Sequence, residues 1–208
     1  MILENLKWRY ATMQFDTKRE IPKEDLEVIL KASNLSATGF GLQPFKIVVV
    51  TDQNTKDALL PHAYNQTHAT QNSALIVFAV VTNIDKAFIT EYTNRIESIR
   101  NLEAGSTDGF KASMVKSMGS KTPEERLIWA QKQAYIALGT MMVAASELHI
   151  DNHGLEGFNP AGFNEVLGLD ALNLHATVIL ALGYRSPEDE KQHLAKVRKD
   201  LEDIVVHI

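Results

Sequence analysis

The segment from Thr122 to Leu148 is the feature of this sequence that most constrains the fold. Thr122-Pro123-Glu124-Glu125 has the pattern of a helix start, with Thr122 as the N-cap and Glu125 closing a capping box. The helix is predicted to run to about Leu148, and its second half, Ala134 to Ala145, is apolar or small on every side. A helix without a polar face is expected to be buried all round. In a chain of 208 residues it must therefore be central or lie in a subunit interface.

Three apolar runs are predicted to be buried strands, because β-branched and aliphatic residues dominate them. They are Lys46–Thr51, Ala74–Val81 and Ala176–Leu182, and Ile204–Val206 is a candidate edge strand. Helices are predicted at Ile2–Tyr10, from Pro22 onward, after Asn54 as a cap, and at Asp85–Leu102, while Glu103–Lys121 is expected to be a mobile connection or an irregular helical piece. No repeat or interdomain linker is visible, so one layered α+β domain over residues 1–208 is expected.

Charge and composition exclude several kinds of partner. The formal net charge is −5 and no Lys/Arg-rich tract is present, so binding to nucleic acid or to an acidic membrane surface is not expected. The absence of cysteine excludes disulfides, thiolate metal sites and a Cys nucleophile. The longest uncharged central stretch, Gln133–Ser146, is too short to span a bilayer. Charged residues interrupt the first ten positions, so no signal peptide is recognised and a cytoplasmic location is the default.

Motifs of common nucleotide and metal sites are absent or incomplete. Gly39-Phe40-Gly41 has only the first two glycines of the dinucleotide fingerprint, and it follows a predicted helix rather than a strand. His149 and His153 have the spacing of a metal pair on a helix. Asn152 and Gly154 indicate that the helix has already ended there, so no metal site is expected.

Four short segments, far apart in the chain, together resemble the flavin-dependent nitroreductase family. They are Trp8–Asp16, Ser36–Phe45, Leu155–Phe158 and Lys196–Arg198, and they follow the family's order over nearly the whole chain. The resemblance is to the branch of small NAD(P)H nitroreductases, flavin reductases and dihydropteridine reductases. It implies a central, mainly antiparallel sheet flanked by helices, an intertwined homodimer, and FMN as cofactor.

The resemblance also implies which residues hold the FMN phosphate. Arg9, Lys196 and Arg198 are expected to bind it, with Thr38 reaching across from the other subunit. Residues two apart in an extended chain point the same way, so Lys196 and Arg198 can act together. On its own, Lys196-Val197-Arg198 is better explained as a solvated basic tail, and only the other three segments favour phosphate binding. The further cofactor contacts that the resemblance implies are Tyr10, Ala11, Met13, Ala37, Gly39, Gly41, Asn65, His68, Gly154, Leu155, Glu156 and Gly157.

Other matches concern the flavin ring. By resemblance, Asn65 meets the pyrimidine edge and Glu156-Gly157 runs past the ring, where a backbone N–H reaches N5 and glycine allows a close approach. Asn65 fits a polar turn equally well. Phe40, Tyr64 and Phe110 are expected to line the substrate side, since flat acceptors stack on aromatic rings, although core packing would explain Phe40 as well.

Two positions depart from the family's pattern. Met13 stands where the family commonly has Lys, and His68 where it has Lys or Gln, beside the flavin edge that becomes negative on reduction. Met13 supplies no positive charge, which leaves the redox potential open. From the ordinary His pKa of about 6.5, His68 is predicted to take up a proton around pH 6 to 8 when the flavin is reduced.

The implied reaction is a ping-pong transfer of two electrons from NAD(P)H, through FMN, to a nitroaromatic, quinone, flavin or pterin acceptor. The flavin carries the chemistry, so no side chain is assigned a catalytic role. The sequence chooses neither the acceptor nor between NADH and NADPH. Two alternatives stay open, namely a dehalogenase-like or flavin-fragmenting enzyme on the same fold, and a non-enzymatic flavin- or ligand-binding dimerisation module.

Overall fold

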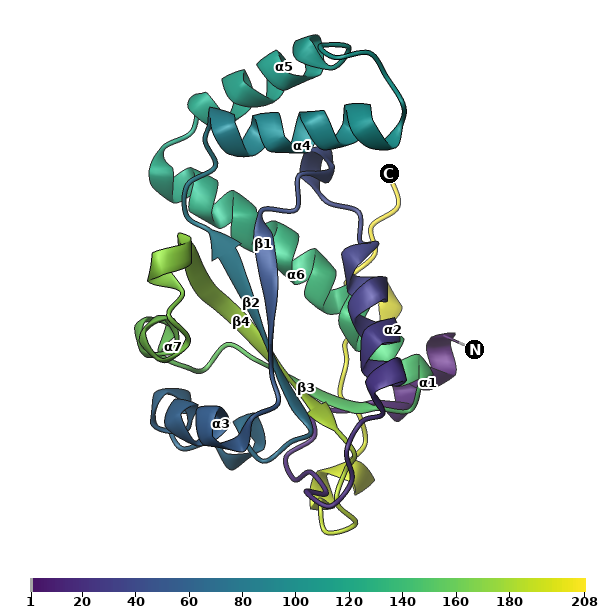
Figure 1. The fold of residues 1–208 in the computed structure, drawn as a ribbon. Coiled ribbons are helices and arrows are strands. Elements are labelled where there is room, and N and C mark those ends of the chain that lie inside the picture. Colours follow the sequence, from purple (N-terminus) through teal and green to yellow (C-terminus); the bar gives the residue numbers. More distant parts are fainter. Residues whose placement is uncertain (1) are drawn as a thin grey trace.

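A four-stranded antiparallel sheet lies at the centre of the computed structural model, which describes residues 2–208 (Figure 1). The strands are β1 (Phe45–Val50), β2 (Ala74–Val81), β3 (Asp151–Leu155) and β4 (Leu174–Gly183), in the spatial order β1-β2-β4-β3. The two central strands, β2 and β4, are buried along most of their length because helices cover both faces of the sheet. This explains why their sequences are continuous apolar runs rather than alternating ones.

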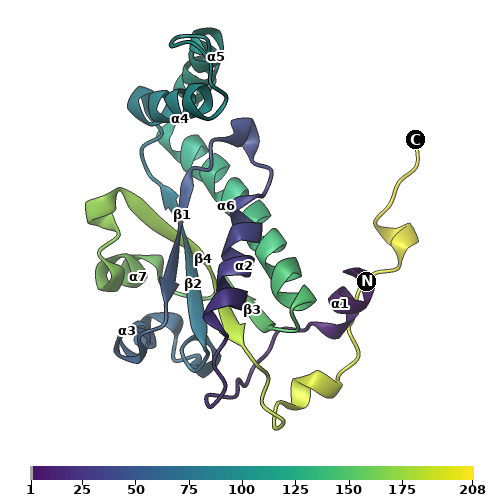
Figure 2. The same ribbon diagram turned by 45° about the vertical axis from the view of Figure 1, so that its right-hand side comes forward.

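Seven α-helices surround the sheet in the described residues. They are α1 (Ile2–Trp8), α2 (Lys23–Asn34), α3 (Gln53–Leu59), α4 (Lys86–Ile99), α5 (Asp108–Gly119), α6 (Pro123–Glu147) and α7 (Pro160–Leu167). Helices α2 and α6 pack on one face, and α3 and α7 on the other (Figures 1 and 2). Helices α4 and α5 form a hairpin at one end of the molecule (Figure 1). The expected α+β fold with a mainly antiparallel sheet is confirmed. None of the helices in residues 2–208 is long and apolar enough to cross a membrane.

Helix α6 begins with the predicted capping box. The Thr122 backbone N–H donates to Glu125 Oε2 at 2.7 Å, and the Glu125 N–H donates to Thr122 Oγ1 at 3.1 Å. The expectation of burial on every side is wrong for the single chain. Met141 and its neighbours face the sheet and α2, whereas Tyr135 and Ile136 are 39% and 46% exposed, because no element within residues 2–208 covers that side.

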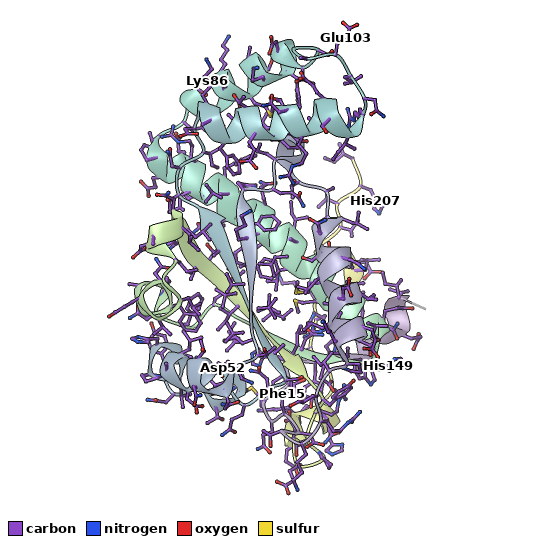
Figure 3. The ribbon with its side chains drawn as sticks, in the orientation of Figure 1. Phe15, Asp52, Lys86, Glu103, His149 and His207 are labelled. Atoms are coloured by element: carbon purple, nitrogen blue, oxygen red, sulfur yellow. The ribbon has the colours of Figure 1, made fainter. Side chains whose placement is uncertain are left out.

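Several predicted elements differ from the structure. Asp52 caps α3, accepting the Thr55 N–H at 2.8 Å, and the predicted cap Asn54 lies inside the helix (Figure 3 labels Asp52). The segment expected to be irregular contains the regular helix α5. Ile204–Val206 forms no strand, because no sheet edge of the described chain pairs with it. Strand β3 and helix α7 were not predicted, since β3 contains Asn152 and Gly154, which are poor strand formers.

Candidate functional site

Residues from the two ends of the chain line a cavity of about 360 Å³. One wall comes from Arg9, Tyr10, Ala11 and Met13, and the other from Lys191 and the segment Leu194–Arg198. The Lys196 ammonium donates a hydrogen bond to the Arg9 carbonyl, and Arg9 Nε donates to Asn152 Oδ1 at 3.2 Å. Within residues 2–208, none of the ion pairs involves Arg9, Lys196 or Arg198. The predicted phosphate cations are thus together and free of carboxylates.

These cations perturb one another. Burial lowers the pKa of Arg9, the positive charge of Arg198 lowers it further, and Asp151 opposes both. Burial also lowers the pKa of Lys196, with further lowering by Arg9 and Arg198. Both shifts express the cost of holding like charges close together with incomplete hydration. An anion bound among the three cations would remove that repulsion and accept charge-assisted hydrogen bonds.

A buried carboxylate holds the N-terminal wall of the cavity in place. Asp189, 1% exposed, accepts the backbone N–H groups of Met13 at 2.8 Å and Gln14 at 3.1 Å, and the Tyr10 hydroxyl at 2.9 Å. Burial raises the pKa of Asp189, but these hydrogen bonds outweigh burial, so the net pKa is lowered and the group is ionised at neutral pH. Sequence reasoning missed Asp189, because one acid within a charged stretch carries no distinguishing signal.

A second buried pair ties β3 to the end of β4. Asp151 accepts the Arg185 backbone N–H and Nε, each at 2.8 Å. The Arg185 guanidinium also lies over the rings of Trp8 and Tyr10, 4.3 and 4.6 Å from their centroids. Arg185 therefore has its own carboxylate and aromatic partners, which separates it from the unpaired cations of the cavity.

The turn at Tyr64 and Asn65 lies against the segment that follows β3. Both residues adopt left-handed backbone conformations, with φ of 52° and 57°. Gln66 Nε2 donates to the Gly157 carbonyl at 2.6 Å. Glu156 accepts the Tyr135 hydroxyl at 2.6 Å, and burial followed by this contact raises the pKa of Tyr135 to about 12. The structure thus brings the segments of Asn65 and of Gly154–Gly157 together, and the β3 bridge between Ala11 and Asn152 joins them to the cation cavity.

The burial of His68 and the pKa of its ring differ from what the sequence predicts. Its side chain is 6% exposed, and its ring stacks on that of His153. Burial, and then the neighbouring His153, lower the pKa of His68 to about 4. Its ordinary value of 6.5 is therefore the wrong starting point, because the free protein keeps His68 neutral throughout pH 6 to 8.

The predicted aromatic wall forms a separate group beneath the α4–α5 hairpin. The Phe40 ring lies 6.2 Å from that of Phe110 and 6.3 Å from that of Trp129, and Phe40 and Phe110 are each 40% exposed. Phe40 has a left-handed φ of 59°, and its carbonyl accepts the Tyr92 hydroxyl at 2.7 Å. The Gly39 N–H donates to Gln133 Oε1 at 2.7 Å, which fixes the turn against α6.

Within one chain, this aromatic group and the cation cavity are far apart. Trp129 belongs to the first third of α6. Helix α1 lies at the other end of α6 (Figure 1), where Asn5 Nδ2 donates to Glu147, and Arg9 directly follows α1. The helix has 25 residues, and at 1.5 Å per residue it is about 37 Å long. Tyr64 is also separate from this group, because it ends the short 3-10 helix Pro61–Ala63, which packs against α3 and α7. Ala37 and Thr38 belong with the aromatic group, and Thr38 Oγ1 is buried with no hydrogen-bond partner among the described residues.

Comparison with known proteins decides the family. The Nitroreductase family model matches residues 6–184. The chain belongs to the nitroreductase family. The resemblance inferred from the four motifs is therefore confirmed, and family membership makes this nitroreductase an oxidoreductase.

Relatives of this nitroreductase match over its full length. A Staphylococcus aureus (strain USA300) protein, named provisionally as an NAD(P)H nitroreductase, is 31% identical over 214 residues, covering 98% of this chain and 94% of the relative. The major NAD(P)H-flavin oxidoreductase of Aliivibrio fischeri is 28% identical and covers 98% and 97%. The fold agrees with the structure of a nitroreductase family protein from Streptococcus pneumoniae, with a TM-score of 0.85, 18% identity and complete coverage of both chains. A provisionally named nitroreductase from Exiguobacterium sibiricum, solved with FMN, has a TM-score of 0.82 at 19% identity, covering 100% of this chain and 97% of the other.

Proposed function

We propose that this nitroreductase is an FMN-dependent NAD(P)H oxidoreductase that passes two electrons, by a ping-pong scheme, to a flat acceptor. A nitroaromatic, a quinone, a flavin or a pterin has the required shape. The observation that carries the proposal is the set of Arg9, Lys196 and Arg198, which line one cavity and have no carboxylate partner in residues 2–208. The relative solved with FMN and the relative named for NAD(P)H and flavin support the same assignment. Residues 1–208 are proposed to form one domain.

The residues present fit FMN on three grounds. The unpaired cations suit a phosphate. Three buried polar atoms have no hydrogen-bond partner in the part of the chain that the structure describes, namely Thr12 Oγ1, Thr38 Oγ1 and His68 Nε2. Such atoms are costly unless a ligand or water satisfies them. A Cβ at Gly157 would meet nothing nearer than Gln66 Nε2 at 3.7 Å, so the packing of the chain does not itself require glycine there. Glycine at position 157 is explained if the space beside it is occupied by the bound cofactor.

When bound, FMN accepts a hydride from NAD(P)H and returns two electrons to the second substrate. The protein's part is binding and orientation. Arg9, Lys196 and Arg198 would hold the phosphate, Asn65 would orient the pyrimidine edge, and the Glu156-Gly157 segment would offer a backbone N–H to the ring. Tyr10, Ala11, Met13, Gly154 and Leu155 line the remaining surface. Asp189 keeps the Tyr10–Gln14 segment in position through its three hydrogen bonds.

The apolar surfaces left open by the single chain support the homodimer. Ile128, Tyr135 and Ile136 form an exposed apolar face on α6, at positions that helical spacing puts on one side. The outer edge of β1 pairs with no strand in residues 2–208, and a cavity of about 290 Å³ lies beside it. The C-terminal tail leaves the body of the molecule, with Val197 and Val206 more than 80% exposed (Figure 2). We propose that α6 packs on its copy in the partner and that the tail covers the partner's β1 edge, where Ile204–Val206 could extend the sheet.

A composite site follows from the distance between the two groups of predicted residues. Ala37, Thr38, Gly39, Phe40, Gly41 and Phe110 lie at one end of α6 and the cation cavity at the other, so one chain does not complete the site. We propose that each FMN is held by the cations of one subunit and approached by the Thr38–Gly41 turn and the aromatic wall of its partner. This arrangement also gives Thr38 Oγ1 a ligand to bind.

The cofactor assignment is tested by the absorbance spectrum of the purified protein. A yellow protein that releases FMN on denaturation, identified by chromatography, is expected. A colourless protein that cannot be reconstituted with FMN would leave only a non-enzymatic module. Steady-state rates with NADH or NADPH and a quinone should give parallel double-reciprocal lines, as a ping-pong scheme requires. A flavoprotein that does not oxidise NAD(P)H would instead be another enzyme class on this fold.

The homodimer is tested by light scattering at micromolar protein concentration. The expected particle has twice the 23.2 kDa mass of the chain. The variant Ile136→Glu places a charge on the proposed α6 interface and is expected to weaken association. Ala58→Glu is the control, because it adds the same charge to an exposed position of α3, on the opposite face of the sheet. A 23.2 kDa particle for the unmodified protein would contradict the dimer.

A further inference from the structure

Two histidines from distant parts of the chain stack face to face beside the cation cavity. His68 lies in the short 3-10 helix Thr67–Ala69, and His153 lies in β3. Their ring centroids are 4.5 Å apart and the ring planes differ by 5°. The His68 side chain is only 6% exposed, yet within the described residues its Nε2 atom has no hydrogen-bond partner. A buried, unsatisfied nitrogen of this kind needs an explanation.

One proton of the pair is fixed by the backbone. His153 Nδ1 lies 2.9 Å from the Thr12 carbonyl oxygen, which only accepts hydrogen bonds, so Nδ1 carries a proton. Thr12 is flanked by Ala11 and Met13, which line the cation cavity. The pair is thus connected to the cavity wall, and a neutral His153 has its other nitrogen, Nε2, as a bare acceptor.

The charges around the pair keep it neutral in the free protein. Burial lowers the pKa of both rings, His153 further lowers that of His68, and Arg9 further lowers that of His153. Asp189 opposes these shifts on both rings, and the bond to Thr12 opposes them on His153. Two parallel imidazoles this close repel each other when both are charged, so the pair accepts one proton, not two.

We propose that His68 and His153 act as one proton-accepting unit, neutral when the cofactor is oxidised and singly protonated when it is reduced, with His153 positioning His68. This inference rests on the proposed function. The proton balance is simple, because the hydride from NAD(P)H brings two electrons and one proton to the site. A two-electron acceptor such as a quinone takes up two protons. The second proton comes from solvent, is held on the free Nε2 of His68 and is released to the acceptor on reoxidation.

The pair would thereby stand in for the permanent positive charge of a lysine, because it becomes positively charged only when the cofactor is reduced. Negative charge on a neighbouring group favours the protonated form of an imidazole. For a two-electron couple a tenfold change in equilibrium constant corresponds to about 30 mV, so one extra proton makes the potential fall by about 30 mV more per pH unit. The steeper region should begin at the pKa of His68 in the oxidised, FMN-bound protein. The same burial and the same His153 ring act on that pKa as in the free protein, where they lower it to about 4.

Spectroelectrochemical titration of the FMN-bound protein from pH 4 to 8 is the test. The unmodified protein is expected to show the steeper region, and His68→Gln to lose it. His153→Phe keeps a ring for stacking but removes the neighbouring imidazole, so it should keep the extra proton and move the start of the steep region to higher pH. His175→Gln, a histidine on β4 that contacts Asn164, is the matched control and should follow the unmodified protein.

Parallel curves for the unmodified protein and His68→Gln would overturn the proton-accepting role. Coincident curves for the unmodified protein and His153→Phe would overturn the positioning role of His153. A second measurement uses the unmodified protein, so that a misfolded variant cannot mislead it. The ¹⁵N chemical shifts of the histidine rings are recorded at pH 6, and one ring is expected to become cationic when the flavin is reduced. Unchanged shifts in a protein that binds FMN refute the pair alone, whereas a protein that binds no FMN refutes the proposed function and, with it, the pair.

Discussion

Replacing Arg198 with alanine should change cofactor binding and the stability of the apoprotein in opposite directions. Within residues 2–208, Arg198 Nη1 donates only to the neighbouring Val197 carbonyl, at 2.5 Å, and the side chain is exposed, so the fold does not depend on it. Its charge lowers the pKa of both Arg9 and Lys196. Removing it relieves that repulsion, and the apoprotein should melt at the same temperature or higher.

The effect on FMN binding follows from the lost phosphate contact. A hydrogen bond to a charged group contributes about 1.5–3 kcal/mol. Each 1.4 kcal/mol is tenfold in affinity, so Arg198→Ala should weaken FMN binding roughly ten- to a hundredfold. The dissociation constant is measured by the quenching of FMN fluorescence on titration with apoprotein, and stability by thermal unfolding of the same samples.

The neighbouring Lys199 offers a matched control, because Lys199→Ala removes the same charge one residue further along an exposed segment. Lys199 does not line the cavity, so its removal should leave FMN affinity largely unchanged at physiological ionic strength. Equal losses of affinity in the two variants would show a general effect of net charge. A destabilised Arg198→Ala apoprotein would refute the reasoning that the cations repel one another in the empty cavity.

Three further changes test other parts of the structure. Gly41→Ala should lower the melting temperature, because φ at this position is +72° and the added Cβ would lie 2.4 Å from the Tyr92 hydroxyl, whereas Gly109→Ala meets open space inside α5 and should be neutral or stabilising. The apoprotein should lose stability as the pH falls from 6.5 to about 4, since the unfolded chain binds the His68 proton first. That gap of about 2.5 pH units corresponds to roughly 3 kcal/mol, and denaturant unfolding of His68→Gln should show a weaker pH dependence. Thr122→Ala should cost about 1 kcal/mol in urea unfolding and Thr122→Ser much less, because serine keeps the cap of α6.

The parts of the fold that could be predicted from the sequence are those fixed by local patterns. Strand β2 was predicted with its observed bounds, Ala74–Val81, because both faces are buried and every residue in it is apolar. The start of α6 was equally clear, since the whole capping box is contained in four residues. The edge strand β3 lacks such a signal, because its polar residues are buried by tertiary hydrogen bonds such as that from Arg9 to Asn152.

The site divides in the same way. The residues of the four motifs could be proposed because a family pattern marks them, and the structure gathers most of them into two groups. The sequence does not identify Asp189 and His153 as residues of the site. Each belongs to it through a contact with a segment more than a hundred residues away. The burial of His68 was missed for the same reason, and a lowered pKa has no signature in the neighbouring sequence.

The contacts that close the cation cavity join the first and the last parts of the chain. Asp189 accepts the backbone N–H of Met13, and Lys196 donates to the Arg9 carbonyl, across more than 170 residues in each case. During synthesis, Arg9 leaves the ribosome long before Lys196 is added, so a nascent chain cannot yet form the site. Contacts with such large sequence separation also form late in folding, because the loop they close must first lose its entropy. FMN should therefore bind only after synthesis of the chain is complete. A protein truncated before residue 189 should bind no FMN, even if its sheet is folded.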